Sequence, residues 1–480
     1  MTTDTANPPT PPTAPTELRW RTLLCFLLML AAIQLIMGPK IHLSQWNARA
    51  DENAGVLEGV AWMQGRLDLP DQGPDPAHTR MHDTAYLDGK VYNVFPPLVG
   101  FLTVILAPLH RLMLDRADLW LQTPMVLLVF WPIPIAGFVV FRRQTGDAAW
   151  AALLTVGWMG GTALLPELSD AGRGQLAQMN HVLSQFGLLI VAADLLGRQR
   201  IWPALIGLTI AVWTRQMTCL YALPLLYVAW QRKRLLPCIA GLVVIAAPLL
   251  TLNYLKFGSP LDFGYRHIYV NRDGEPLAER CNAHGTFSPR FIPDNFYYMH
   301  LAPPEVQEIT TTRVHVVAPN LHGVSIWITT PLLFFVLIDA RRWLAAGASN
   351  EVGARIPQRA PPIRATHVSK WSPRDIVARA RFLFRTYISE NPFPHAFDPR
   401  RRLLMLATLP VMLGLLCYHG TGFIQPGWNR FALDFLPIWL AVIAPWTRGG
   451  WRTWFTLGCI AWSLLYFQTL TPNVALAPPV

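Results

Sequence analysis

Two short stretches of the chain hold the residue types that proton transfer and anion binding require. One stretch has two adjacent carboxylates, Asp51 and Glu52. The other has a carboxylate at Asp83, followed by an ammonium at Lys90 and a phenol at Tyr92. A carboxylate can take the proton of a reacting hydroxyl, and a cation or a phenol can bind a developing oxyanion. These five residues are therefore the first candidates for catalytic or binding side chains.

The second stretch has a local pattern that would hold Lys90 and Tyr92 in fixed positions. An Asp-Gly pair at 88–89 predicts a tight turn between two short extended runs. Lys90 and Tyr92 then share one side of the second run, because side chains on a strand alternate. A Pro-Pro pair at 96–97 opens an apolar segment, where missing N–H groups at a helix start cost little. We expect the cation and the phenol just above the hydrocarbon of a membrane, at the level of a lipid phosphate.

The first stretch leads into an amphipathic run over residues 56–67, with Glu58 and Arg66 on its other faces. Such a run predicts a helix that lies in the membrane interface. An acidic pair directly before a helix also fits a solvated N-terminus, where the helix dipole favours carboxylates. Asp51 and Glu52 thus have a structural interpretation beside the catalytic one.

The composition is that of a protein embedded in a membrane. Of 480 residues, 52% are hydrophobic and only 14% are charged, and many apolar segments have the roughly 17–25 residues that span a bilayer. We expect an all-α integral membrane protein with about 11 transmembrane helices, in a range of about 10–13, and with interfacial helices in its first outer loop. The candidate spans are 20–38, 94–113, 119–141, 147–165, 178–196, 201–230, 235–253, 323–340, 402–418, 430–447 and 452–470.

The net charge of +11 is unevenly distributed, and much of it lies in a basic interval between two apolar segments. This pattern indicates a cytoplasmic loop in contact with anionic lipids rather than a nucleic-acid-binding surface. Arg19 and Arg21, before the first apolar run, place the N-terminus in the cytoplasm. The chain then divides into a disordered cytoplasmic tail (1–18), a transmembrane module (19–340) with outer loops 39–93 and 254–322, the basic cytoplasmic loop (341–401), and C-terminal transmembrane helices (402–480).

One apolar region resists a simple assignment. Residues 202–230 are long for one helix and short for two, and Arg215 lies at their middle. Two crossings here would move the loop 254–322 to the cytoplasmic side, so a single bent crossing is the preferred interpretation. That choice leaves four arginines on the outer side, against the usual charge bias. They are Arg142, Arg143, Arg198 and Arg200.

Charged side chains inside the apolar segments suggest a use, because each costs roughly 2.5–3.5 kcal/mol at the bilayer centre. Arg430 and Asp434 are four residues apart and would share a helix face. They either pair with each other or leave Arg430 to reach a lipid phosphate. Arg215 has no acidic partner nearby in the sequence and would snorkel or line a hydrated cavity. Trp428 suits either an interfacial aromatic belt or a platform for a sugar ring.

The six cysteines and the histidines add no metal or redox site. Five cysteines lie in apolar segments, the sixth is alone in a polar stretch, and none has metal-ligand spacing. No phosphate-binding Gly-Lys-Ser/Thr loop is present, which argues against an ATP-driven pump. We therefore expect no required metal or cofactor, although a divalent metal stays possible in principle.

Several motifs in order resemble one family of membrane enzymes. They are GRLDL at 65–69, DTAYLDGKVYNVFPP at 83–97, NYLKFGSPLDFGY at 253–265, HGTFS at 284–288, NFYY at 295–298, GVSI at 323–326 and RFALDFLP at 430–437. Together they are similar to bacterial polytopic glycosyltransferases of the GT-C superfamily, related to the protein mannosyltransferase and aminoarabinose transferase (glycosyltransferase family 39-like) group. The resemblance touches most of the chain between residues 46 and 437.

The resemblance implies a polyprenyl-phosphate sugar donor, an acceptor outside the cytoplasm, and inversion at the anomeric carbon. The acceptor would be a glycan, a lipid or a protein, and the enzyme a hexosyl- or pentosyltransferase of the bacterial inner membrane. Asp51 is then the candidate base, with Glu52 as its alternative, and Asp83 would orient the acceptor or help to hold a metal. Lys90 and Tyr92 would contact the phosphate.

Two other functional classes remain open. A transporter or flippase for a lipid-linked saccharide would show interrupted helices in repeated halves with polar residues at the midplane. The concentration of polar residues in two outer loops favours the enzyme. A non-catalytic assembly partner would have little need of the acidic residues.

Overall fold

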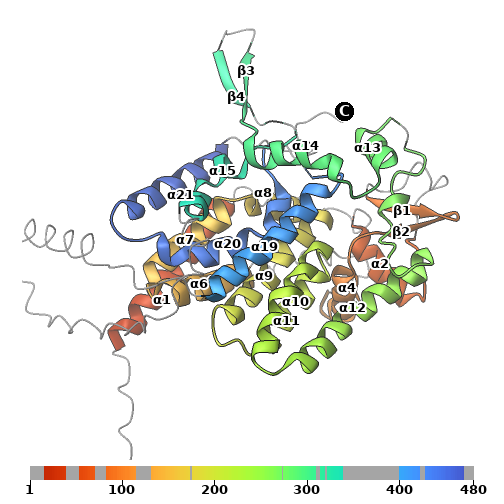
Figure 1. The fold of residues 1–480 in the computed structure, drawn as a ribbon, viewed down its shortest axis with the longest axis horizontal. Coiled ribbons are helices and arrows are strands. Elements are labelled where there is room, and N and C mark those ends of the chain that lie inside the picture. Colours follow the sequence, from red (N-terminus) through yellow and green to blue (C-terminus); the bar gives the residue numbers. More distant parts are fainter. Residues whose placement is uncertain are drawn as a thin grey trace, which may run out of the picture.

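A computed structural model describes residues 16–38, 53–70, 83–114, 131–172, 176–272, 274–309, 314–318, 320, 322–338, 399–421 and 427–469. Asp51, Glu52, residues 1–15 and nearly all of the basic interval 341–401 lie outside these ranges. Within them, helices form one bundle and the strands form two hairpins (Figure 1). The helix α1 begins at Thr16, so the end of the segment expected to be disordered is helical.

The helices of the bundle and the strands have the following bounds. The first part of the chain forms α1 (Thr16–Met37), α2 (Ala54–Met63), β1 (Thr84–Leu87), β2 (Lys90–Asn93), α4 (Leu98–Leu114), α6 (Pro132–Thr145), α7 (Ala148–Gly160), α8 (Leu164–Gly172), α9 (Leu176–Leu195), α10 (Trp202–Val212), the 3₁₀ helix η3 (Gln216–Tyr221), α11 (Ala222–Gln231) and α12 (Leu235–Phe257). The second part forms η4 (Tyr265–His267), α13 (Pro276–His284), η5 (Pro289–Phe291), α14 (Ile292–Phe296), η6 (Tyr297–Leu301), β3 (Glu305–Ile309), β4 (Val314–Ala318), α15 (Ile326–Thr329), η7 (Pro331–Leu333), α16 (Phe334–Ile338), α19 (Pro399–Cys417), η9 (Arg430–Asp434), α20 (Leu436–Ile443), η10 (Ala444–Trp446) and α21 (Trp451–Thr469).

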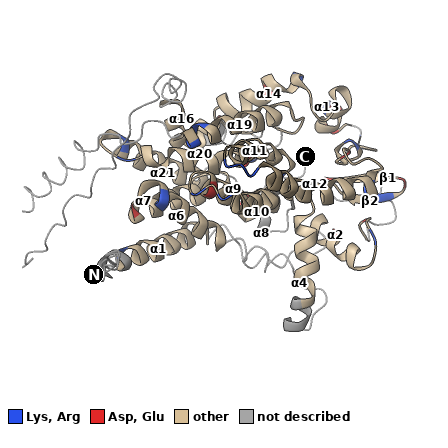
Figure 2. Cartoon of the chain, turned by 60° about the horizontal axis from the view of Figure 1, so that its bottom comes forward, with Lys and Arg blue, Asp and Glu red and all other residues tan. Residues whose placement is uncertain are grey.

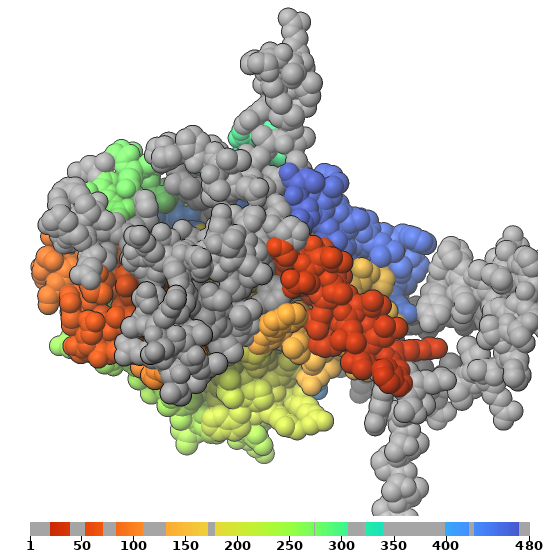
Figure 3. Space-filling view, turned by 180° about the vertical axis from the view of Figure 1, so that it is seen from behind, coloured from red at the N-terminus to blue at the C-terminus, as the bar shows by residue number. Residues whose placement is uncertain are grey.

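Two of these helices, α1 and α12, are long and apolar enough to cross a membrane, and α7 with α8 would make a third crossing bent by 55°. Their apolar side chains also face outward: Leu24 and Leu28 on α1 are 56% and 60% exposed, and Leu236 on α12 is 78% exposed. Figure 3 shows α1, in red, on the surface of the bundle. An exterior of this kind suits lipid rather than water as the surrounding medium.

One end of the bundle is rich in arginine, and its hydrogen bonds join segments far apart in the chain. Arg400 donates to the carbonyl of Gly197 at 2.9 Å, and Arg401 donates to the side chain of Gln144. Arg448 and Asp147 form an ion pair at 2.7 Å. We call this end the arginine end; it comprises Arg142, Arg143, Arg198, Arg200, Arg232, Arg400, Arg401 and Arg448.

Four arginines of the first half of the chain lie at the same end of the bundle as Arg400 and Arg401, which corrects the expectation for these four. Arg142, Arg143, Arg198 and Arg200 were expected opposite the basic interval. Their neighbours instead contact the end of that interval: the carbonyl of Gly197 accepts from Arg400, and the side chain of Gln144 accepts from Arg401. The sequence could not show this because the pairing joins residues about 200 to 250 positions apart. Figure 2 shows how few charges the rest of the bundle carries.

The region from Trp202 to Trp230 is a helical hairpin and not a single bent helix. The helix α10 leads away from the arginine end, η3 turns the chain, and α11 returns. The side chain of Arg232, just after α11, donates to Gln199, just before α10, at 2.8 Å. One bent crossing would place these residues on opposite sides, so the expected single crossing is wrong. The helix α10 packs on α9 through Gly187 and Gly207, where an added Cβ would lie 2.5–2.6 Å from the carbonyl oxygen of the facing glycine.

The opposite end carries the loops, and a buried ion pair anchors it. Lys256, near the end of α12, pairs with Glu58 of α2, and its ammonium also donates to the carbonyl of Asn93 at 3.0 Å. The amide of Asn93 donates to Glu58 at 2.8 Å. We call this the loop end; it comprises α2, the β1–β2 hairpin and residues 258–301, which Figure 1 shows around and across one end of the bundle. The outer loops expected at 39–93 and 254–322 thus meet at the same end.

Two expectations for the first loop have different outcomes. The turn at Asp88 and Gly89 is confirmed: both have positive φ (51° and 77°) and they join the antiparallel pair β1–β2. Glu58, which was expected on a face other than the apolar one of an interfacial helix, is buried, with an exposed fraction of 0%. The helix α2 packs against α4, where Gly59 lies against Thr103, and so it belongs to the bundle core.

The buried pair generates a stability prediction. Replacing Glu58 with Gln leaves the ammonium of Lys256 buried without a counter-charge, and we expect a loss of about 3–5 kcal/mol in the free energy of unfolding. Adding Lys256→Met to the same chain should recover much of that loss. Unfolding of the purified protein in detergent, followed by tryptophan fluorescence, measures both changes.

The control is the pair of Arg66 and Asp68, in which the arginine side chain is 46% exposed. Solvent screens this pair, so Asp68→Asn should cost less than about 1 kcal/mol. Equal losses for Glu58→Gln and Asp68→Asn would show that burial of the Glu58–Lys256 pair does not matter.

Candidate functional site

A buried ion pair joins the middle of the α10–α11 hairpin to the helix η9. The guanidinium of Arg215, between α10 and η3, donates to both carboxylate oxygens of Asp434, at 3.1 Å and 2.9 Å. Asp434 has an exposed fraction of 0%, and Tyr221 donates to its backbone carbonyl at 3.0 Å. Asp434 was expected to pair with Arg430 if it had a partner. Its strong partner is instead Arg215, 219 residues away.

A second cation lies beside this pair. The guanidinium carbons of Arg215 and Arg430 are 5.2 Å and 5.4 Å from the centre of the Phe431 ring. The face of an aromatic ring attracts a cation electrostatically, so it can hold a guanidinium without neutralising its positive charge. Two positive groups therefore lie against one aromatic side chain next to the carboxylate of Asp434.

The helices α8 and α9 add polar side chains that are buried and incompletely bonded. Glu167 is 1% exposed; the indole of Trp428 donates to one of its oxygens at 3.0 Å, and the other oxygen has no bond from any described residue. Asn180 and Asn429 are 0% and 1% exposed, and neither side-chain amide has a partner within the described part of the chain. His181 lies 3.7 Å from Asp434 without a hydrogen bond. Buried polar groups nearly always have partners, so this arrangement indicates a place for water or for a polar ligand.

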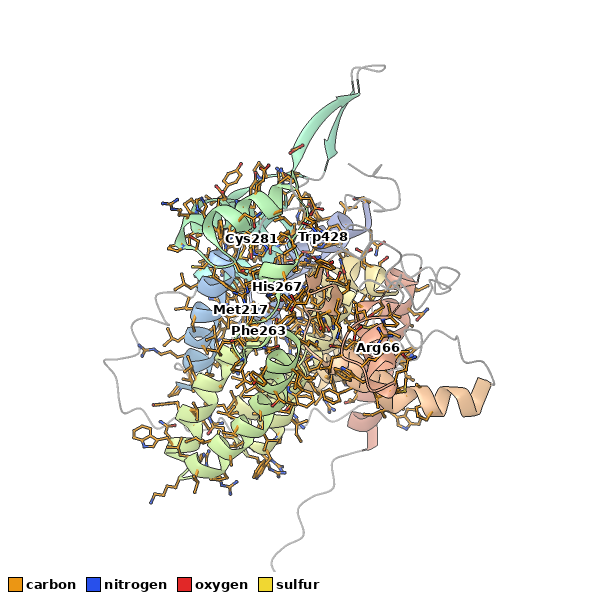
Figure 4. All side chains as sticks on the ribbon, turned by 90° about the vertical axis from the view of Figure 1, so that its right-hand side faces the viewer. Arg66, Met217, Phe263, His267, Cys281 and Trp428 are labelled. Carbon is orange, nitrogen blue, oxygen red and sulfur yellow. The ribbon has the colours of Figure 1, made fainter. Side chains whose placement is uncertain are left out.

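An aromatic wall separates this cluster from the loop end. Tyr418 packs its ring against Phe431 (5.7 Å between ring centres) and against Tyr265 (5.8 Å). Tyr265 contacts Gln216, the neighbour of Arg215, at 3.3 Å. Burial raises the pKa of Tyr265, and the nearby carboxylate of Asp83 adds to the rise. Asp83 therefore lies within electrostatic range of Tyr265. Figure 4 shows the side chains from one side of the bundle, with the labels of Met217, Phe263 and His267 below those of Cys281 and Trp428.

The structure brings together some of the predicted residues and separates others. Arg215, Arg430 and Asp434 form one cluster, and Asp83 lies near its aromatic wall. Lys90 and Tyr92 lie elsewhere on the loop end. Lys90 is exposed, and the ring of Tyr92 meets that of Phe257 edge-on at 5.7 Å. Asp51 and Glu52 lie outside the described residues, so the structure does not place them.

Sequence reasoning missed the polar side chains of α8 and α9. Glu167 is an acid inside an apolar stretch, and the argument that singled out Arg215 would also have found it. Asn180 and Asn429 gave no signal, because amides are common in apolar helices. Trp428 is 4% exposed and bonds to Glu167, so it is not part of an interfacial belt. Within the described ranges, no three His, Cys, Asp or Glu side chains are grouped so as to hold a metal ion.

An apolar groove lies on the side of the bundle. It has a volume of about 660 Å³, lies between α2, α4 and α12, and is lined by Trp62, Phe101, Pro248 and Leu252 with Arg66 at its edge. A small enclosed pocket shares Leu252 with the groove and is lined on its far side by Gln216, next to Arg215. The groove has room for an alkyl chain, whereas the pocket, at about 10 Å³, has room for about one water molecule.

The aromatic wall makes a prediction about pH. Burial lowers the pKa of His419 to about 4, and Nε2 of its ring is hydrogen-bonded to the hydroxyl of Tyr269 at 2.7 Å. Between about pH 6.5 and pH 4 the unfolded chain therefore binds a proton that the folded chain excludes, so the free energy of unfolding falls as the pH falls. We expect a lower melting temperature at about pH 5 than at about pH 7.5.

His419→Gln removes the imidazole that binds this proton. It should therefore reduce the difference between the melting temperatures at about pH 5 and about pH 7.5. His300, whose pKa burial also lowers to about 4, would account for a remaining part. The control is His284→Gln, since His284 is exposed at the same end of the bundle and its loss should leave the difference unchanged. Equal differences in wild type and His419→Gln would exclude the mechanism.

Comparison with known proteins adds no relative from which to infer a function. No protein-family model, curated protein or solved structure matches the chain at a significant level.

Proposed function

We propose that the chain is a membrane glycosyltransferase of the GT-C type that moves a sugar from a polyprenyl-phosphate donor to an acceptor at the loop end. The observation that carries the proposal is the guanidinium pair of Arg215 and Arg430 against Phe431, beside buried polar groups without partners. A lipid phosphate ester needs an apolar groove for its chain, cations for its phosphate and polar groups for its sugar. The cations and the polar groups lie together in the cluster, and the groove lies on the side of the same bundle.

The reaction is an inverting single displacement. The acceptor hydroxyl attacks the anomeric carbon while the bond from that carbon to the phosphate oxygen breaks, and the polyprenyl phosphate leaves with the bonding electrons. Arg215 and Arg430 stabilise the charge that grows on the phosphate. Asp51, or Glu52 in its place, takes the proton of the hydroxyl, and Asp83 orients the acceptor. Lys90 and Tyr92 guide the headgroup at the entrance, since they lie apart from the guanidinium pair.

The membrane orientation belongs to the same proposal. Arginines collect at one end of the bundle and the long loops at the other, so we assign the arginine end to the cytoplasm and the loop end to the outside. The hairpin of α10 and α11 adds one crossing to the eleven of the sequence-based expectation, and keeping both long loops on the outer side requires one further crossing earlier in the chain, so the number rises to about 13. The N-terminus stays in the cytoplasm, and the acceptor meets the donor outside it.

Activity measurements test the mechanism. Arg430→Gln and Asp51→Asn should each reduce sugar transfer from polyprenyl-phosphate donors by about 10²–10³-fold, because each removes a group that acts in the transition state. Lys90→Ala should mainly weaken donor binding and raise KM. Arg266→Ala is the matched control, since this arginine is exposed and pairs with Asp262 at the surface of the loop end.

Wild-type rates in both Arg430→Gln and Asp51→Asn would remove the proposed mechanism. Transport of the donor across a vesicle membrane with no transfer to any acceptor would favour the flippase instead.

Labelling in intact cells tests the orientation. In a chain without its native cysteines, Asp88→Cys at the loop end should react with a membrane-impermeant maleimide, while Lys233→Cys at the arginine end should react only after lysis. Both positions are exposed, so access to the reagent depends on the side of the membrane alone. Reaction of Lys233→Cys in intact cells would reverse the assignment.

A further inference from the structure

A second groove runs along the outside of the bundle, away from the cluster of Arg215 and Asp434. It lies between α6 and α9 and has a volume of about 800 Å³. Its walls are mainly apolar, from Pro132 and Val139 on α6 to Phe186 and Ile190 on α9. The groove extends from the start of α6 to its last turn, about 16 Å at the helical rise. That length is enough for an extended chain of about a dozen methylene groups.

Three arginines line one end of this groove. Arg143 comes from the last turn of α6, and Arg198 and Arg200 come from the loop after α9. All three side chains are exposed. The acid that also lines this end, Asp194, uses both oxygens to accept backbone N–H groups, from Arg200 at 3.0 Å and from Ile201 at 2.9 Å. It therefore holds the loop and leaves the three positive charges to attract an anion.

The loop that carries two of these arginines has a strained backbone. Gln199 has a φ of 54° and Ile201 has a φ of 74°, a region that β-branched side chains rarely adopt. The hydrogen bonds to Asp194 and the bond from Arg232 to Gln199 hold this conformation. Strain of this kind persists where the surrounding structure requires it, and it is common at binding sites.

We propose that this groove binds one anionic phospholipid, with an acyl chain along α6 and α9 and the phosphate at Arg143, Arg198 and Arg200. Charge complementarity selects the occupant: an apolar channel with three guanidiniums at one end matches an alkyl chain with an anionic head. The site is separate from the proposed catalytic cluster. His181, at the start of α9, belongs to the cluster, whereas Arg198 follows the other end of the same helix. The proposal does not depend on the proposed reaction.

Native mass spectrometry of the full chain tests the site. The delipidated protein would be titrated with phosphatidylglycerol and with phosphatidylcholine in detergent. We expect one phosphatidylglycerol to bind about tenfold more tightly than phosphatidylcholine. The combined variant Arg143→Gln, Arg198→Gln and Arg200→Gln should lose this preference. Ala193→Leu, which narrows the apolar wall, should weaken both lipids.

The matched control is Arg142→Gln, because Arg142 neighbours Arg143 in the same helical turn, is exposed, and does not line the groove. It should bind phosphatidylglycerol as the wild type does. Competition by inorganic phosphate alone at equal concentration would show that the arginines bind free phosphate. It would overturn the proposal that the ligand is a lipid. An unchanged preference in the triple variant would overturn the site, as would the absence of any bound lipid, which is expected if another part of the chain fills the groove.

Discussion

The ion pair between Arg215 and Asp434 is the interaction on which much of the bundle depends. Neither charge can be buried among apolar helices alone, since an isolated ion costs several kcal/mol to remove from water. Arg215 lies in the break between α10 and η3, and Asp434 lies at the end of η9. Satisfying the pair therefore requires the hairpin of α10 and α11 to meet the segment before α20. The hairpin, the aromatic wall and the position of Arg430 follow from that meeting.

The same constraint acts a second time at the loop end. Glu58 and Lys256 are 198 residues apart and both nearly fully buried, and Asn93 bonds to each of them. This contact ties α2 and the β1–β2 hairpin to the end of α12. It also holds the β1–β2 hairpin close to η4, which carries Tyr265 of the aromatic wall. Two buried ion pairs thus place the two loops relative to the cluster.

The candidate groups for binding in the cluster are buried polar side chains without hydrogen-bond partners in the described part of the chain. The second oxygen of Glu167 and the amides of Asn180 and Asn429 have no partner among the described residues, beside two guanidiniums. A fold gains nothing in stability from such groups. These groups, together with the two guanidiniums, are the basis of the proposal that the cluster binds a polar, lipid-linked substrate. The second groove differs because its arginines are exposed and its acid, Asp194, accepts two hydrogen bonds from the backbone. This arrangement suits the proposed resident lipid and not a reaction.

The sequence by itself determined the local features of this protein. Apolar length predicted the helices α1 and α12, the Asp-Gly pair predicted the turn of the β1–β2 hairpin, and unusual charges in apolar segments singled out Arg215, Arg430 and Asp434. These features depend on neighbouring residues, through helix length, turn conformation and the cost of burying a charge. Only the tertiary structure decided which charges meet. It paired Asp434 with Arg215 and not with Arg430, buried Glu58 against Lys256, folded residues 202–230 into a hairpin, and gathered the arginines at one end. Each of these outcomes joins residues tens to hundreds of positions apart, and no local pattern carries that information.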